Sequence, residues 1–72
     1  MDYDLRVWQN PLPNSTYVVG GDPAEGLAHG DDAVLEVICC ETGEQVCELQ
    51  GKVDPISFGE LSYMLGTWYN HA

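Results

Sequence analysis

The stretch that decides the fold is YVVGGDPAEGLAHGDD, residues 17–32. Its opening apolar run predicts a strand over residues 16–21, which we expect to be central in its sheet because both of its faces are apolar. Asp22 comes at the end of this strand, since Pro23 has no amide hydrogen with which to continue a ladder of hydrogen bonds. Asp22 is therefore expected at the rim of a sheet, where a loop begins.

An aspartate held at the end of a strand suits a divalent metal ion. Gly20 and Gly21 stand beside Asp22 and let other groups approach closely. Mg²⁺ binds through one or two fixed carboxylates together with waters, so Asp22 is a candidate metal ligand. The alternative is that Gly-Asp and Asp-Pro only make a turn, which is the more common role of these residue types.

The residues after this stretch predict two more strands and one helix. Strands are expected over residues 32–41 and 45–53, joined as an antiparallel hairpin by a turn that contains Gly43, with the later strand on the outside of the sheet. Asp54 and Pro55 have the residue types that cap and begin a helix. The apolar residues that follow recur at steps of three and four, so this helix should pack on the sheet.

The first fifteen residues are expected to be an extended lead-in to a domain over residues 16–72. Pro11 and Pro13 favour an extended, non-helical path. Trp8 is the exception in this polar segment, and it either packs on its own domain or contacts a domain that precedes it.

Size, charge and cysteine usage narrow the function classes. A chain of 72 residues forms one small domain. Its net charge of −10 repels a phosphate backbone, so the chain alone should bind nucleic acid poorly. The odd number of cysteines, Cys39, Cys40 and Cys47, indicates neither a disulfide framework nor a zinc site, and we expect them to pack in the core of a cytosolic protein. No signal peptide and no membrane span is evident in the sequence.

The order strand, acidic loop, strand, turn, strand, helix resembles the opening of the ribonuclease-H-like fold. The motifs resemble the nuclease domain of the large terminase subunit of tailed phages, and they are YVVGGDPAEG (17–26), GDD (30–32), TGE (42–44), DP (54–55) and YN (69–70). The resemblance extends from about Arg6 to Ala72, and Trp8 and Pro13 resemble the segment that enters that domain from the packaging ATPase.

This resemblance implies an α+β (α/β) fold, a truncated ribonuclease-H-like domain with a three-stranded antiparallel meander followed by one C-terminal helix. It implies a metal-dependent DNA endonuclease that acts in phage DNA packaging, a hydrolase that uses paired Mg²⁺ or Mn²⁺ ions. Asp22 matches the aspartate that binds the catalytic metal. Asp31 matches an acidic position of the same loop and would support the metal, and Glu25 would do likewise.

The family takes its remaining carboxylates from a later strand and a later helix or loop, whereas this chain ends at Ala72, where the next strand would begin. We therefore expect weak metal binding and no nuclease activity from this chain alone. The implied partners of the intact protein are double-stranded DNA and other terminase and portal subunits, in the cytoplasm of the bacterial host and without a membrane. Because the first strand would lack its neighbour, we also expect a homo-oligomer that forms through the bare edge of residues 17–21.

Two other interpretations remain open. Sugar kinases and actin-like ATPases also open with an aspartate at a strand end, although Glu25 would put negative charge where their phosphate lies. A different class is a non-enzymatic acidic module that uses its charge of −10 to mimic DNA or to bind a basic partner.

Overall fold

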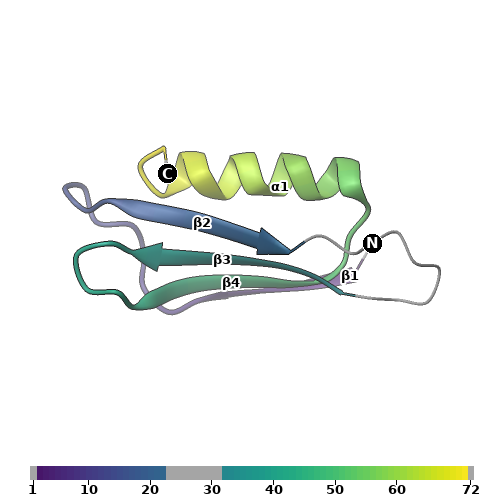
Figure 1. Ribbon diagram of the computed structural model, residues 1–72, viewed down its shortest axis with the longest axis horizontal. Coiled ribbons are helices and arrows are strands. Elements are labelled where there is room, and N and C mark those ends of the chain that lie inside the picture. The colour runs from purple at the N-terminus through teal and green to yellow at the C-terminus, as the bar shows by residue number, and fades with distance from the viewer. Residues whose placement is uncertain (1, 23–31, 72) are drawn as a thin grey trace.

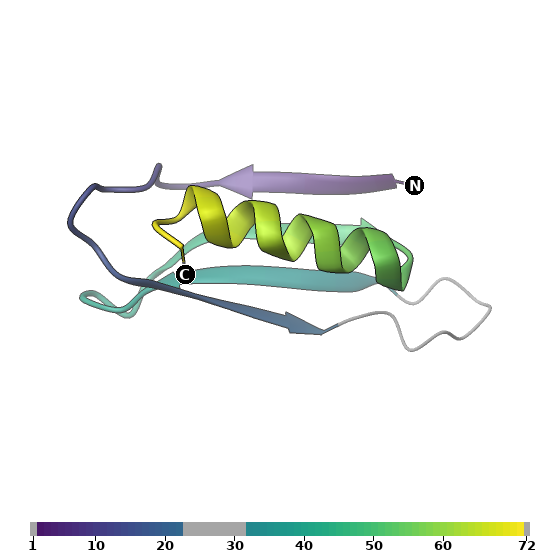
Figure 2. The same cartoon turned by 90° about the horizontal axis from the view of Figure 1, so that it is seen from above.

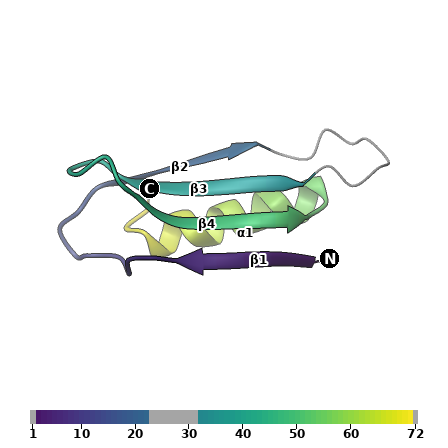
Figure 3. The ribbon, with the colours of Figure 1, turned by 90° about the horizontal axis from the view of Figure 1, so that it is seen from below.

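The computed structural model describes residues 2–22 and 32–71, which form a small α+β fold (Figure 1). Its elements are β1 (Asp2–Val7), β2 (Tyr17–Asp22), β3 (Ala33–Cys39), β4 (Gln45–Lys52) and α1 (Pro55–Trp68). All neighbouring strands are antiparallel, and they form one sheet in the order β1-β4-β3-β2, which is seen from below in Figure 3. The helix α1 lies on one face of this sheet (Figures 1 and 2).

The sheet has one strand more than the three that the sequence predicted, because part of the expected lead-in forms β1. This strand pairs with β4, and Leu5 lies opposite Leu49. Its sequence, DYDLRV, alternates charged with apolar residues, which is the pattern of a strand with one face toward a core. Pro11 and Pro13 follow β1 and do not interrupt it.

Two predictions of strand position were wrong for this chain. β2 was expected to be central, but among the described strands it lies at an edge of the sheet, beside β3. β4 was expected on the outside, but it lies between β1 and β3 because β1 occupies its other side. Val18, one of the apolar residues that suggested a central strand, is 50% exposed on the face away from the helix.

The hairpin between β3 and β4 forms as predicted, with Gly43 at a positive φ of 73° in its turn. One irregularity interrupts its register: Val37 lies opposite Cys47 and Ile38 opposite Gln45, so Val46 is an extra residue on β4. Val46 and Cys47 are both buried, whereas strict alternation along a strand would place them on opposite faces.

The start of α1 is the one that the sequence predicted. Asp54 has an extended backbone, and its Oδ1 accepts a hydrogen bond from the Ser57 amide at 3.0 Å. Pro55 takes the first helical position, where its missing donor has no intrahelical partner to lose. At the other end Asn70 and His71 have φ values of 60° and 57°, a left-handed conformation that ends the helix.

The core lies between α1 and the sheet, and its residues from α1 and the segment after it are Leu65 and Tyr69. Tyr69 is fully buried, and its ring meets that of Tyr17 edge to face with centroids 4.9 Å apart. Cys39 and Cys47 are buried in the core as predicted, whereas Cys40 is exposed at the end of β3.

Hydrogen bonds from the end of the helix hold the segment that connects β1 to β2. The Tyr69 hydroxyl donates to the Gln9 carbonyl at 2.7 Å. The Asn70 Nδ2 donates to the carbonyls of Leu12 at 2.7 Å and Ser15 at 2.9 Å. Tyr69 and Asn70, one of the motifs that carry the resemblance, thus join the end of the helix to the connection before β2.

Candidate metal site at the end of β2

Asp22 is the last residue of β2 and lies exposed on the face of the sheet opposite to α1. A Cβ atom added to Gly21 would lie 2.8 Å from Cζ of Phe58 on α1, so this position faces the helix. Side chains alternate between the faces of a strand, which puts Asp22 on the other face. Opposite Asp22 on β3 is Val34.

The two glycines before Asp22 have different roles. At Gly21 an added Cβ would also lie 2.9 Å from Cδ2 of Leu35, so only glycine lets Phe58 and Leu35 pack this closely over β2. At Gly20 an added Cβ would meet nothing within 4 Å, and the outer face of the sheet is open beside Asp22. The sequence predicted a close approach at this pair of glycines, and at Gly21 the approaching group is a core side chain.

An open hollow of about 380 Å³ lies beside Asp22, lined also by Gly20, Gly21, Val34 and Glu36. Glu36 lies opposite Gly20 across the strands, so it is the diagonal neighbour of Asp22 on the same face. Diagonal neighbours have their Cα atoms about 7–8 Å apart, within reach of a glutamate side chain. The hollow therefore brings two carboxylates to one side of the sheet.

Glu36 was missing from the residues that the sequence predicted. It lies on the second strand between Leu35 and Val37, both buried, so its place on the solvent-facing side could have been inferred from alternation. Its position next to Asp22 depends on the register between β2 and β3, which the sequence pattern does not specify.

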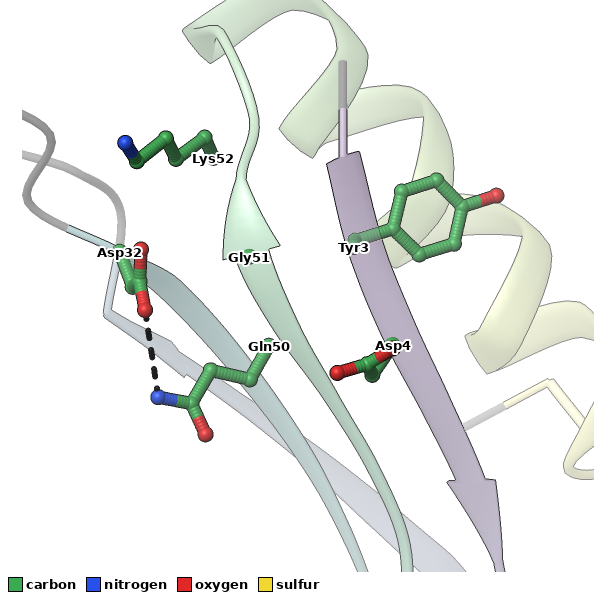
Figure 4. A pocket seen from close by; sticks show the side chains of 6 residues that line it. All are labelled: Tyr3, Asp4, Asp32, Gln50, Gly51 and Lys52. Carbon is green, nitrogen blue, oxygen red and sulfur yellow. Dashed lines mark hydrogen bonds between the residues drawn. The ribbon is translucent and has the colours of Figure 1, made fainter.

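The other two predicted site residues, Glu25 and Asp31, lie outside the described residues. Asp32 is described and exposed, and its Oδ2 accepts a long hydrogen bond of 3.4 Å from Nε2 of Gln50. Figure 4 shows Asp32 with Asp4, Gln50 and Lys52 around a second hollow of about 520 Å³. This hollow is lined by residues of β1 and β4, on the opposite side of β3 from Asp22.

The described residues offer a metal ion only part of a site. Within residues 2–22 and 32–71 there is no group of three His, Cys, Asp or Glu side chains that could hold a metal. Asp22 and Glu36 supply carboxylate oxygens, the donors that Mg²⁺ uses, and an ion there would keep most of its waters. Asp22 is exposed, and Arg6 of β1 lies opposite Glu48, at the other edge of the sheet from β2.

Carboxylates with a lowered pKa lie elsewhere and stabilise the fold. The Thr16 amide donates to both oxygens of Glu41 at 3.0 and 3.1 Å, and this lowers the pKa of Glu41 below its ordinary value of 4.5. At Asp54 the Ser57 amide donates to Oδ1 and the Ser57 hydroxyl donates to Oδ2, and these bonds lower the pKa of Asp54 below its ordinary value of 3.8. Glu41 thus stabilises the backbone at the start of β2, and Asp54 stabilises the start of α1.

The α1 helix has 14 residues, and no helix among the described residues is long and apolar enough to cross a membrane. Comparison of the chain with protein-family models, with curated proteins and with solved structures gave no match.

Proposed function

We propose that this chain is the opening part of a ribonuclease-H-like, metal-dependent DNA endonuclease domain similar to that of the large terminase subunit of tailed phages. The observation that carries the proposal is Asp22, exposed at the end of an edge strand and beside a hollow that it shares with Glu36. The meander β2-β3-β4 followed by α1 has the element order that the resemblance implies.

The free edge of β2 supports the same proposal. Among the described strands β2 pairs only with β3, so its other edge presents backbone donors and acceptors that a further strand can use. A strand added there would bring its side chains next to Asp22. In the intact domain such a strand would supply a further acidic ligand, and in this chain alone the same edge offers a route to self-association through residues 17–21.

In the intact domain Asp22 would hold the ion directly, and Glu36 would accept hydrogen bonds from its waters. The ions of such a site activate a water for attack on the phosphodiester and stabilise the leaving oxygen. This chemistry needs several carboxylates at one point, whereas the described residues bring only two together. We therefore expect no cleavage of DNA by this chain, and we assign contacts with double-stranded DNA and with terminase or portal subunits to the intact protein.

Calorimetric titration with MnCl₂ tests the role of Asp22. We expect weak binding, with a Kd on the order of 1 mM, because Asp22 and Glu36 are too few ligands to displace much of the water of the ion. Asp22→Asn should weaken the binding at least fivefold, and the matched variant Glu44→Gln, in the turn at the other end of the β3–β4 hairpin, should leave it unchanged. Equal affinity of the Asp22→Asn variant and the parent chain would remove the basis of the proposal.

A plasmid nicking assay with Mg²⁺ or Mn²⁺ complements this titration. The parent chain should leave the plasmid intact at any metal concentration. Cleavage that disappears in Asp22→Asn would overturn the expected inactivity of this chain while supporting the assignment of Asp22.

A second candidate is the acidic module that binds a basic partner. Acidic side chains from all four strands share the outer face of the sheet, namely Asp4, Glu48, Glu36 and Asp22. Binding of a basic protein that weakens with salt and is unchanged by Asp22→Asn would favour this function over the nuclease domain.

A further inference from the structure

In the part of the chain that the structure describes, the buried core contains no residue of β1. Its members come from β2, β3, β4, α1 and the short segments after β4 and α1. The three β1 side chains on the helix side of the sheet, Tyr3, Leu5 and Val7, are 41%, 49% and 38% exposed. β1 therefore adds little to the core that holds the other elements together.

The helix does not hold β1 in place either. α1 packs against β2 and β3, whereas β1 packs against β4 alone. From above, β1 lies clear of α1 along its length (Figure 2). An apolar groove of about 210 Å³ lies between Leu5 on β1 and Met64 and Trp68 on α1. The ladder of hydrogen bonds with β4 is thus the main contact of β1.

The chain is firmly held again directly after β1. The Gln9 amide donates to the Val46 carbonyl at 3.2 Å, and the Gln9 carbonyl accepts a hydrogen bond from the Tyr69 hydroxyl at 2.7 Å. Tyr69 is fully buried, so the second bond ties Gln9 to the core. Trp8, between β1 and Gln9, is 57% exposed. The connection to β2 can therefore stay in place when the ladder of β1 breaks, with Trp8 as the hinge.

The contacts along β1 are similar from one end to the other. Leu5 lies opposite Leu49 and Val7 opposite Cys47, and in both pairs the β4 residue is buried while the β1 residue is about half exposed. No residue of β1 is anchored more firmly than its neighbours. An opening that starts in β1 has nothing to stop it before Gln9.

We propose that β1 is a displaceable strand, which leaves β4 as one unit by turning about Trp8 while the other strands and α1 stay in place. The open form exposes the edge of β4. This goes beyond the proposed nuclease role and does not depend on it, because Asp22 lies on the strand at the other edge of the sheet.

Hydrogen exchange of the intact chain, followed by NMR, tests this opening. The β1 amides that bond to β4 should share one protection factor, at least about a hundredfold below that of the amides between β3 and β4, and Gln9 should keep the higher protection. Protection that rises gradually from the first residue of β1 to Val7 would indicate fraying of the end in place of a unit. Protection of β1 equal to that between β3 and β4 would mean that β1 opens only with the whole fold. Either result, or loss of protection at Gln9 together with β1, would overturn the proposal.

β4 supplies an internal control, because alternate amides of a middle strand point to opposite neighbours. The amides of Glu48, Gln50 and Lys52 point to one neighbour, and those of Leu49 and Gly51 to the other. The set that faces β1 should exchange with β1, and the set that faces β3 should stay slow. Equal protection of the two sets would contradict a separate opening of β1.

A pair of variants at the two edges separates β1 from the core. Leu5→Ala removes the apolar contact opposite Leu49, so it should lower the protection of β1 at least about threefold and leave the amides between β3 and β4 unchanged. Val18→Ala is the matched control, since Val18 is 50% exposed on β2, and it should not change the protection of β1. If Leu5→Ala lowers the protection of β1 and of the β3–β4 amides equally, β1 belongs to the same cooperative unit as the core and the proposal fails.

Discussion

The two edge strands of the sheet differ in how firmly the helix holds them. Tyr17 of β2 and Tyr3 of β1 both point to the face that carries α1, yet Tyr17 is 3% exposed and Tyr3 41%. The difference arises because α1 packs on β2 and not on β1. The apolar side chains of an edge strand are thus buried only where the helix packs over them. Regular alternation of apolar and polar residues along the strand does not bury them by itself.

Side-chain packing holds β2, whereas β1 depends mainly on its backbone. β2 has the Tyr17–Tyr69 ring contact at one end and Phe58 over Gly21 at the other. β1 has its ladder with β4, continued by the Trp8 amide, which donates to the Val46 carbonyl at 2.9 Å. Local opening is easiest where few apolar contacts are lost, so β1 should detach before the rest of the fold opens.

The largest predicted effect compares the two tyrosines. Tyr17→Ala removes a buried ring and should lower the free energy of unfolding by about 3–5 kcal/mol, most of the stability of a small domain. Tyr3→Ala should cost less than about 1 kcal/mol, since its ring is already half exposed. Urea unfolding followed by circular dichroism measures both. Equal losses would contradict the difference between the edges.

The next effect compares the two glycines of β2. Gly21→Ala places a Cβ 2.8 Å from Phe58 and 2.9 Å from Leu35, and the shift that it forces should cost about 1–3 kcal/mol because Leu35 is buried in the core. Gly20→Ala meets nothing within 4 Å and serves as the matched control, with little or no loss. A Gly21→Ala variant as stable as the control would mean that α1 does not press on β2 as described.

The free edges should also differ in self-association. We expect a weak dimer that forms through residues 17–21 at high protein concentration and strengthens with salt, which screens the net charge of −10. Sedimentation at increasing concentration detects it, and hydrogen exchange should show added protection in β2 and none in β1. A monomer at all concentrations, with fast exchange of the β2 amides, would rule out this edge as an interface.

The smallest effect concerns pH. The pKa of Glu41 and that of Asp54 are lowered by amides that donate to them in the folded chain. Such groups contribute stability that is complete above their unfolded pKa values of 4.5 and 3.8 and is lost as pH falls through the lower folded values. The urea midpoint should therefore decline below about pH 5. Glu41→Gln should flatten part of this decline, and Glu44→Gln should not.

Local chemistry made most elements predictable from the sequence. The helix start followed from Asp54 and Pro55, and the β3–β4 hairpin followed from the turn at Gly43. β1 was missed although DYDLRV alternates fully, because the prolines after it suggested a linker. The alternation was a usable signal for a strand. Its partner β4 could not be inferred, because the pairing joins residues forty or more positions apart.

The candidate site was predictable only in part. The end of the strand and its exposed aspartate followed from Gly20, Gly21 and Pro23. Glu36 could not be placed beside Asp22 from the pattern alone, because that contact depends on the register between β2 and β3. The roles of the two glycines also needed the helix position, which brings Phe58 over one of them and leaves the other open.

The most direct test of the central claim is to locate bound Mn²⁺ on the folded chain by paramagnetic broadening of amide NMR signals. The account predicts that the signals of Gly21, Asp22 and Glu36 broaden at the lowest Mn²⁺ concentrations, and that Asp22→Asn abolishes this effect. Broadening that centres on Asp4 and Asp32 instead, or that persists unchanged in Asp22→Asn, would contradict the assignment of Asp22 as the metal ligand of this fold.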